Sequence, residues 1–289
     1  MVVHEWAPPQ RAAGKPVILF VHGIGMHGEP YAAIAAGFTS RGVTFIAPDL
    51  RGHGRSQGKR GILAQARVMR SDLDTVLALV EKRHPAAPVI LMGDSMGALI
   101  AADYARRGQK RLTGLILLTP AFQVHPSRLC VPPEIKELSM TGHISIGKAG
   151  PFGAVTTASL GIGIDARVSI DTAEHLGAGT RVPGFIRAKQ RDPLALHEVN
   201  MTYLLRLAQT GAEWPEAASE LKLPLIMCMA GEDRIIDAET AKRVFDRAGT
   251  SKGQKTWKKW DNACHTLCWD PVTPELIDYL AEWATQQRK

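Results

Sequence analysis

The chain is poor in cysteine and in aromatic residues, and it has no apolar run long enough to cross a bilayer. Its 289 residues include four cysteines, which are too few and too scattered for a disulfide framework. A membrane-spanning helix needs about 20 consecutive apolar residues, and no such run occurs. With 45% hydrophobic and 22% charged residues, the chain has the composition of an ordinary globular protein that can bury a substantial core.

The N-terminus lacks the features of a secretory signal. Residues 1–9, Met-Val-Val-His-Glu-Trp-Ala-Pro-Pro, contain no basic region followed by a long apolar stretch. The scarcity of cysteine also fits a reducing compartment, and we expect a cytoplasmic protein.

Metal-binding patterns are incomplete. Cys264, His265 and Cys268 lie close together, but no second Cys/His pair follows at a spacing that would complete a tetrahedral zinc site. A His-Glu pair at 197–198 begins a pattern typical of zinc proteases, but Met201 stands where the second histidine is required. We therefore expect neither a metal nor an organic cofactor.

The chain is basic, with a formal net charge of +7 and a sequence pI of about 9.3. Such a balance favours anionic partners such as membrane surfaces, acidic substrates or nucleic acids. The basic residues form short, scattered clusters, and no nucleic-acid-binding module or repeated aromatic platform accompanies them. We expect a solvated basic surface and no nucleic-acid partner.

Short apolar runs rich in β-branched residues alternate with helical patterns. The clearest helical pattern covers residues 63–80, whose apolar side chains recur every three or four positions, and prolines 85 and 88 end it. Alternating strands and helices imply right-handed crossovers and a mostly parallel sheet covered on both faces. The predicted fold class is α/β, with strands at Val17–Val21, Val43–Pro48, Val89–Met92, Leu115–Thr119, Pro224–Met229 and, more weakly, Thr256–Trp260.

The alternation stops between about Ala121 and Asn200. Within this segment, residues 141–163 contain six glycines and no sustained periodicity. Its apolar residues would suit a cap over an apolar pocket, and an irregular loop packed on the core is the alternative. The predicted organisation is a core in two parts, 1–120 and 201–289, with a cap inserted at 121–200. A helix is predicted over Asp192–Leu207.

Ser95 is the first candidate catalytic residue. The sequence Gly93-Asp94-Ser95-Met96-Gly97 directly follows an apolar run and directly precedes a helical pattern over Ala98–Arg107. Strand, tight turn and helix are the context of a nucleophile elbow, in which two glycines let the backbone turn sharply and expose the central serine. A serine in an ordinary strand-to-helix loop is the alternative.

A nucleophilic serine needs a base to take its proton and usually an acid to orient that base. In enzymes with a nucleophile elbow, both follow the serine in the chain, after later strands. Asp233 follows the run 224–229 and is the leading acid, with Glu232 and Asp237 as competitors. His265 follows the last strand candidate and is the only one of ten histidines downstream of the acid, so it is the expected base.

Two backbone N–H groups are expected to bind the oxyanion that forms during acyl transfer. One belongs to the residue after the nucleophile, here Met96, and the other to the loop after an early strand. That loop has the sequence His22-Gly23-Ile24-Gly25-Met26-His27-Gly28, and Ile24 is the expected second donor. His22 is expected to shape the loop through hydrogen bonds and not to transfer protons.

Together these motifs resemble those of the serine α/β-hydrolases, and within them the branch of monoacylglycerol lipases, lysophospholipases and serine aminopeptidase-type hydrolases. The resemblance implies the fold, a triad of Ser95, His265 and Asp233, and a cap between the sixth and seventh core strands, where the irregular segment falls. It extends in family order over nearly the whole chain, through His22–Gly25, Pro48–Ser56, Gly93–Gly97, Thr119–Pro120, Asp192–Leu194, Gly231–Arg234 and Asn262–His265.

The head group of the substrate is left open by this resemblance. Gly23, Met26 and Cys268 are expected at the substrate site. Well-known monoacylglycerol lipases have polar head-group contacts near the positions of Met26, Pro30 and Cys268. The less polar residues here predict weak selection for glycerol, because a site without hydrogen-bond partners discriminates mainly by size.

The predicted activity is hydrolysis of carboxylic esters with an apolar acyl group through an acyl-enzyme, as in a carboxylesterase, monoacylglycerol lipase or lysophospholipase. An amidase, lactonase or acyltransferase could use the same triad, and a homologue that binds ligands with little or no turnover is an alternative from another class. An apolar cap on a basic protein is compatible with peripheral membrane contact, although no amphipathic surface is located. The oligomeric state is unknown from sequence.

Overall fold

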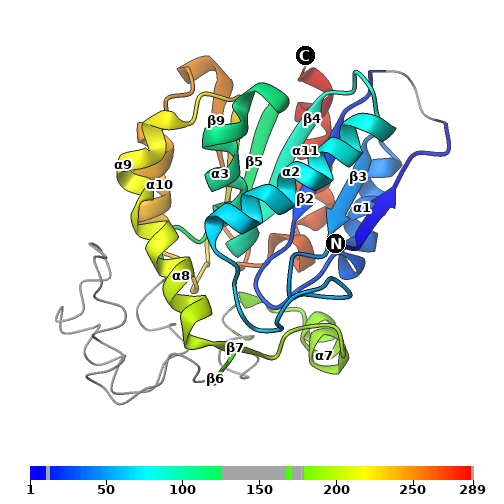
Figure 1. Ribbon diagram of the computed structural model, residues 1–289. Helices are drawn as coiled ribbons and strands as arrows, with labels where there is room; N and C mark the ends of the chain where they lie inside the picture. Colours follow the sequence, from blue (N-terminus) through cyan, green and yellow to red (C-terminus); the bar gives the residue numbers. More distant parts are fainter. Residues whose placement is uncertain (11–13, 125–166, 171–176, 178, 288–289) are drawn as a thin grey trace.

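A seven-stranded sheet forms the centre of the computed structural model, which describes residues 1–10, 14–124, 167–170, 177 and 179–287 (Figure 1). The strand order is β1-β3-β2-β4-β5-β8-β9; β1 is antiparallel to β3, and all other neighbours are parallel. The strands are β1 Val3–Trp6, β2 Val17–Val21, β3 Thr44–Pro48, β4 Val89–Asp94, β5 Gly114–Leu118, β8 Leu225–Ala230 and β9 Lys255–Trp260.

The α/β class predicted from the alternation is confirmed, and all six predicted strands are present with ends shifted by at most two residues. The edge strand β1 was not predicted. Its four residues, Val-His-Glu-Trp, are only partly buried and do not form an apolar run. Its place in the sheet comes from pairing with β3, which no local pattern reveals.

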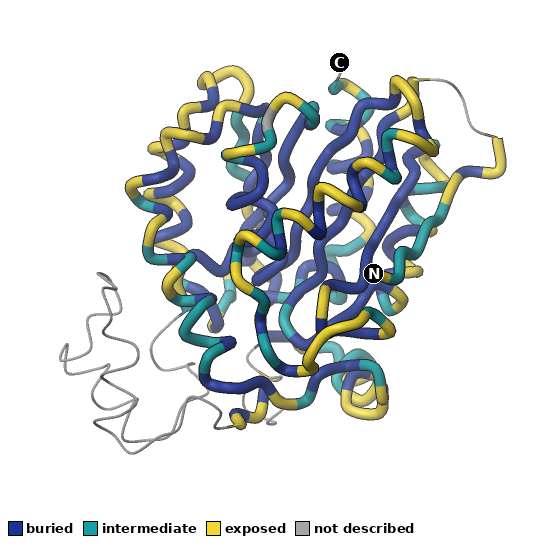
Figure 2. The backbone as a smooth tube through the Cα atoms, in the orientation of Figure 1, coloured by how far each residue is buried: buried dark blue, intermediate teal, exposed yellow. Residues whose placement is uncertain are grey.

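Helices cover both faces of the sheet. Ile18 and Phe20 of β2 pack in one apolar cluster with α1 and α11, and Val17 and Leu19 pack in the other with α2, α3 and α10. This alternation follows from strand geometry, since successive side chains point to opposite faces. Figure 2 shows the buried strands between helices whose outer sides are exposed. The helices around the sheet are α1 Ala32–Thr39, α2 Ala66–Arg83, α3 Met96–Gly108, α8 Met201–Ala212, α9 Trp214–Ala217, α10 Ala238–Arg247 and α11 Thr273–Gln286, with short helices η1 Glu29–Tyr31, η2 Gln109–Arg111, η4 Ala218–Glu220, η5 Lys252–Gln254 and η6 Leu267–Trp269.

An insertion interrupts the alternation between β5 and β8, where the irregular segment was predicted. Most of the expected cap, residues 125–166, 171–176 and 178, lies outside the described residues. The described part comprises β6 Arg167–Ser169, which pairs antiparallel with β7 Glu198–Asn200, and α7 Pro183–Arg191. The insertion follows the fifth strand of the sheet in chain order, not the sixth, and the division at 121 and 200 stays a prediction.

The helix predicted over Asp192–Leu207 is wrong for its first half. α7 ends at Arg191, residues 192–197 form turns, and α8 begins only at Met201. The Asp192 side chain accepts a hydrogen bond from Leu194 N at 2.8 Å, and Asn200 caps α8 by accepting one from Tyr203 N at 2.9 Å. Both side chains offer the backbone a local alternative to helix, which the apolar periodicity does not register.

The turn between β4 and α3 is tightly packed against its neighbours. Ser95, the only residue between the two elements, has a φ of 55°. A Cβ on Gly97 would overlap the carbonyl oxygens of Val21 and His22, and one on Gly93 would overlap the carbonyl of Gly97. The missing side chain of Gly97 therefore lets the turn lie against the end of β2, and that of Gly93 lets the start of α3 fold back against β4.

Gly97→Ala is expected to lower the free energy of unfolding by at least about 2 kcal/mol, because the added methyl meets rigid backbone. Urea unfolding measures this. Gly253→Ala is the matched control, since nothing lies within 4 Å of its added Cβ, and it should change stability by less than about 0.5 kcal/mol. Equal stability of the two variants would contradict the close packing of the turn.

Candidate active site

Backbone hydrogen bonds hold Ser95 in a strained conformation, and Leu99 N at 3.2 Å from Ser95 O is one of them. Its N–H donates to Leu118 O at 2.9 Å, and its carbonyl accepts from Ala98 N at 3.0 Å and from Ala121 N at 3.2 Å. A positive φ outside glycine costs about 1–3 kcal/mol and persists only where the surroundings enforce it. The end of β5 and the first turn of α3 thus fix the direction in which the Ser95 side chain points.

His265 and Asp233 lie in a hydrogen-bonded line with Ser95. His265 Nε2 is 2.8 Å from Ser95 Oγ, and His265 Nδ1 is 2.8 Å from Asp233 Oδ2. A carboxylate only accepts, so Nδ1 carries the proton, and Nε2 is the acceptor for the serine hydroxyl. Asp233 is oriented in turn, because its Oδ1 accepts from Ile235 N at 2.8 Å and Ile236 N at 3.1 Å.

The loop after β9 that carries His265 is tied to the end of β5. Thr119 Oγ1 donates to His265 O at 3.0 Å, and His265 is buried and lines the cavity beside Ser95. Burial alone would lower the pKa of His265, but the adjacent Asp233 carboxylate and, more weakly, Asp94 favour the charged form. The net effect raises the pKa of His265 above 6.5.

The two carboxylates that competed with Asp233 in the sequence have other contacts. Glu232 forms an ion pair with Arg181. Asp237 caps α10 by accepting hydrogen bonds from Glu239 N and Thr240 N, each at 3.2 Å. Of the three candidates, Asp233 is therefore the one whose carboxylate contacts the His265 imidazole.

The loop after β2 is folded back on itself beside Ser95. Met26 N donates to Gly23 O at 3.2 Å, and His22 Nδ1 donates to the same carbonyl at 2.9 Å. Leu50 N in turn donates to His22 Nε2 at 3.1 Å, so both ring nitrogens are occupied. Burial lowers the pKa of His22 to about 4, and the ring is neutral at neutral pH. His22 thus contributes to the shape of the loop through both of its ring nitrogens.

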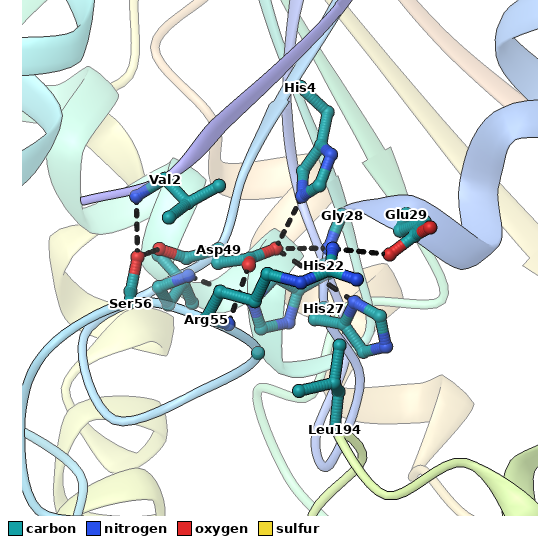
Figure 3. A network of polar contacts seen from close by, with 12 residues as sticks. Val2, His4, His22, His27, Gly28, Glu29, Asp49, Arg55, Ser56 and Leu194 are labelled. Carbon is teal, nitrogen blue, oxygen red and sulfur yellow. Dashed lines mark hydrogen bonds and ion pairs between the residues drawn. The ribbon is translucent and has the colours of Figure 1, made fainter.

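Asp49, at the end of β3, anchors the far side of this loop. Its carboxylate accepts from Gly28 N at 2.8 Å and from Arg55 N at 2.9 Å, and His4 Nε2 lies 3.0 Å from it. Figure 3 shows these residues around the carboxylate. Its carbonyl accepts from Ser56 Oγ at 2.7 Å. Asp49 is completely buried, so these contacts replace the water that the carboxylate loses on folding.

The segment that follows α7 is fastened to the same loop. Leu196 N donates to Gly25 O at 2.8 Å, and His27 Nε2 is 2.7 Å from Asp192 Oδ2. Arg60 adds two hydrogen bonds from its guanidinium to the carbonyls of Leu194 and Ala195. The described end of the insertion is therefore held in a defined position over the loop after β2.

A cavity of about 120 Å³ lies beside Ser95 and His265. A larger cavity of about 920 Å³ adjoins it and shares Met26, Phe185, Lys189 and Trp269 with it. The expected substrate residues Gly23 and Met26 line the first cavity, whereas Cys268 lies in the second together with Pro30. The first is mostly apolar, and its lining includes Ile24, Met96, Ala121, Val124, Ile170, Phe185, Leu204, Leu207, Ile235 and Trp269.

Several residues of the cavity were not foreseen in the sequence. Phe185 and Lys189 come from α7, and Trp269 comes from η6. Asp94 lies inside the elbow motif, at a position where the motif accepts any residue. Only the topology brings these residues together, and no spacing or periodicity marks them.

The fold and the Ser-His-Asp arrangement define an α/β-hydrolase. A sequence profile described as "Serine aminopeptidase, S33" matches residues 12–272, and the chain belongs to this family. No helix within the described ranges is long and apolar enough to span a membrane.

Similar proteins are lipases. Over 284 residues the chain is 26% identical to a monoacylglycerol lipase of Mycolicibacterium smegmatis, covering 98% of this chain and 92% of the relative. It is 27% identical over 272 residues to phospholipase YtpA of Bacillus subtilis, covering 92% and 94%. Among solved structures, a soluble variant of the Saccharomyces cerevisiae monoglyceride lipase superposes with a TM-score of 0.77 at 16% identity, covering 99% and 92%. Membership of a family with such relatives supports an ester hydrolase.

Asp49→Ala is expected to destabilise the protein by at least about 3 kcal/mol, because it leaves buried N–H groups without acceptors. Chemical denaturation measures this. Asp278→Ala is the control, since the Asp278 side chain is 63% exposed in its ion pair with Arg41 and should contribute less than about 1 kcal/mol. A loss for Asp49→Ala no larger than that of the control would show that the Asp49 contacts do not stabilise the loop.

Proposed function

We propose that the protein hydrolyses carboxylic esters through an acyl-enzyme on Ser95. The observation that carries the proposal is the line from Ser95 Oγ through His265 to Asp233, with both contacts at 2.8 Å, beside a mostly apolar cavity. The lipases among its relatives support the same chemistry. A monoester with an apolar acyl chain is the proposed substrate class.

In the proposed reaction, Ser95 Oγ attacks the ester carbonyl carbon while its proton passes to His265 Nε2. The Asp233 carboxylate holds the imidazole in the required tautomer and stabilises its positive charge. The same proton then passes from Nε2 to the oxygen of the leaving alcohol as the C–O bond of the ester breaks. Water attacks the acyl-enzyme in a second round, again with His265 as base, and releases the acid and free Ser95.

Ile24 and Met96 are the proposed backbone donors to the oxyanion. Gly23 N already donates to Tyr31 Oη at 3.3 Å and Met26 N to Gly23 O, which favours Ile24 as the donor from this loop. Met96 is the first residue of α3, so the positive end of the helix dipole adds to its N–H. Ile24 and Met96 both line the cavity beside Ser95.

The proposed acyl site is the wall formed by Val124, Leu204, Leu207 and Ile235, of which Leu204 and Leu207 lie on α8. The proposed head-group side is the wall formed by α7 and η6, which leads into the larger cavity. Figure 1 shows α7 and α8 well apart along the lower edge of the sheet. The head-group side contains Met26, Pro30 and Cys268, which are weak hydrogen-bond partners for glycerol hydroxyls. The size of the alcohol group is therefore expected to determine which esters are hydrolysed.

Hydrolysis of p-nitrophenyl esters from acetyl to palmitoyl tests the proposed function. We expect an optimum of chain length, with turnover reduced by several orders of magnitude in Ser95→Ala and His265→Ala and somewhat less in Asp233→Asn. A monoacylglycerol and the methyl ester of the same acid should be hydrolysed at rates within about tenfold. Full turnover in Ser95→Ala would contradict the mechanism, and no turnover by the intact protein would favour a ligand-binding homologue.

The pH dependence of kcat/KM tests the role of His265. The neutral imidazole is the base, so activity is present above the pKa of His265 and is lost as the pH falls through it. Since Asp233 raises that pKa above 6.5, the midpoint of the acidic limb is expected above pH 6.5. Asp233→Asn should move the limb to lower pH. A limb that stays in place in Asp233→Asn would exclude His265 as the titrating base.

A further inference from the structure

Asp94 is a buried carboxyl that the mechanism above leaves without a role. It is the last residue of β4, is only 4% exposed and lines the cavity beside Ser95. Its Oδ2 accepts a hydrogen bond from Tyr31 Oη at 3.0 Å, but within the described ranges its buried Oδ1 has no hydrogen-bond partner. An unpaired buried polar atom opposes folding, so its presence next to the nucleophile points to a function.

A relay of two hydrogen bonds joins Asp94 to the oxyanion loop. Gly23 N donates to Tyr31 Oη at 3.3 Å, and Tyr31 Oη donates to Asp94 Oδ2. The Tyr31 ring is fully buried between Phe20 and Trp269, with ring centroids at 4.4 and 4.5 Å, so its hydroxyl has a fixed position. The relay therefore ties the residue before Ser95 to the residue before Ile24.

Four titratable groups face Asp94, each from a different element. They are Tyr31 of η1, Cys268 of η6, Asp233 after β8 and His265 after β9. Burial raises the pKa of Tyr31 and of Cys268 well above the ordinary values, so both are neutral at neutral pH. Burial also raises the pKa of Asp94 to about 6, although His265 and Tyr31 partly oppose this. Above that pH, Asp94 is mostly ionised and its charge acts on His265.

We propose that Asp94 is a positioning residue that holds the oxyanion loop through Tyr31 and stabilises the positive charge that His265 gains from the Ser95 proton. This inference rests on the proposed function. The proton moves only from Ser95 Oγ to His265 Nε2, and Asp94 stays ionised throughout. Asp233 acts on the same imidazole through a direct hydrogen bond, so two carboxylates share the stabilisation.

Asp94→Asn separates the charge from the hydrogen bond, because an amide oxygen still accepts from Tyr31 Oη. Removing a negative charge near His265 lowers the pKa of the imidazole, so the acidic limb of kcat/KM should move to lower pH. We expect kcat on the plateau to fall about tenfold. Asp94→Ser, which is also neutral and can accept a hydrogen bond, should shift the limb in the same direction if Asp94→Asn does not fold.

Asp103→Asn is the control for the loss of a buried carboxylate charge. Asp103 lies on α3, is 5% exposed and pairs with Arg70 and Arg106, but it does not line the cavity. Its substitution should leave the position of the acidic limb unchanged, even where it lowers the melting temperature. If Asp94→Asn only destabilised the fold, it would behave like this control: the melting temperature would fall and the acidic limb would stay in place.

Tyr31→Phe tests the relay, because it keeps the ring and removes both hydrogen bonds. We expect kcat to fall about tenfold or more with KM changed by less than about threefold, since the loosened loop acts mainly in the transition state. Tyr104→Phe is the control, because Tyr104 Oη also donates to a carboxylate, Asp74 Oδ1 at 2.7 Å, away from the cavity. This control should change neither constant more than about twofold.

The outcomes distinguish this inference from the proposed function. If the intact protein shows no Ser95-dependent ester hydrolysis, the proposed function fails, and the inference fails with it. If Ser95-dependent hydrolysis is present but the Asp94 variants keep the acidic limb in place and Tyr31→Phe behaves like Tyr104→Phe, the inference alone is overturned. A shifted limb together with a loss of kcat in Tyr31→Phe supports it.

Discussion

The active site depends on how closely the turn between β4 and α3 packs against the end of β2. Because Gly97 has no side chain, the turn reaches the carbonyls of Val21 and His22; because Gly93 has none, the start of α3 packs on β4, and Ser95 between them has a φ of 55°. This packing fixes the direction of the Ser95 hydroxyl and the start of α3 at Met96. It also fixes how far Ser95 and Met96 lie from the loop after β2. The strain of one residue, about 1–3 kcal/mol, is offset by the sheet around it.

Three buried carboxylates around this turn differ in how completely their oxygens are paired. Asp49 and Asp233 each accept hydrogen bonds from two backbone N–H groups, and each holds a loop in place. Asp94 Oδ2 accepts from Tyr31 Oη, whereas Asp94 Oδ1 has no hydrogen-bond partner among the described residues. Burial raises the pKa of Asp94, and its incomplete pairing leaves the group responsive to nearby charge. Asp233 and Asp94 both act on His265, Asp233 through a direct hydrogen bond and Asp94 through its nearby charge.

Much of the fold could be predicted because its strands depend on local sequence, and the three residues expected to act together lie within hydrogen-bond distance of one another. β2, β4 and β8 are buried apolar runs, and chain order alone singled out His265. Asp233 was already the leading acid in the sequence, and the structure adds the contacts that distinguish it from Glu232: Asp233 accepts from Ile235 N and Ile236 N, whereas Glu232 pairs with Arg181. β1 and the turns after Arg191 were missed, since distant pairing and side-chain capping determine them. The contact of Asp94 with Tyr31, 63 residues apart in the chain, leaves no local pattern.

Covalent labelling with a fluorophosphonate, followed by mapping of the modified peptide, tests most directly whether Ser95 is an activated nucleophile. The account predicts a single adduct on Ser95, formed quickly in the intact protein and at least about a hundredfold more slowly in His265→Ala, because the base no longer takes the hydroxyl proton. An adduct on another residue, or a Ser95 adduct that forms equally fast without His265, would contradict it.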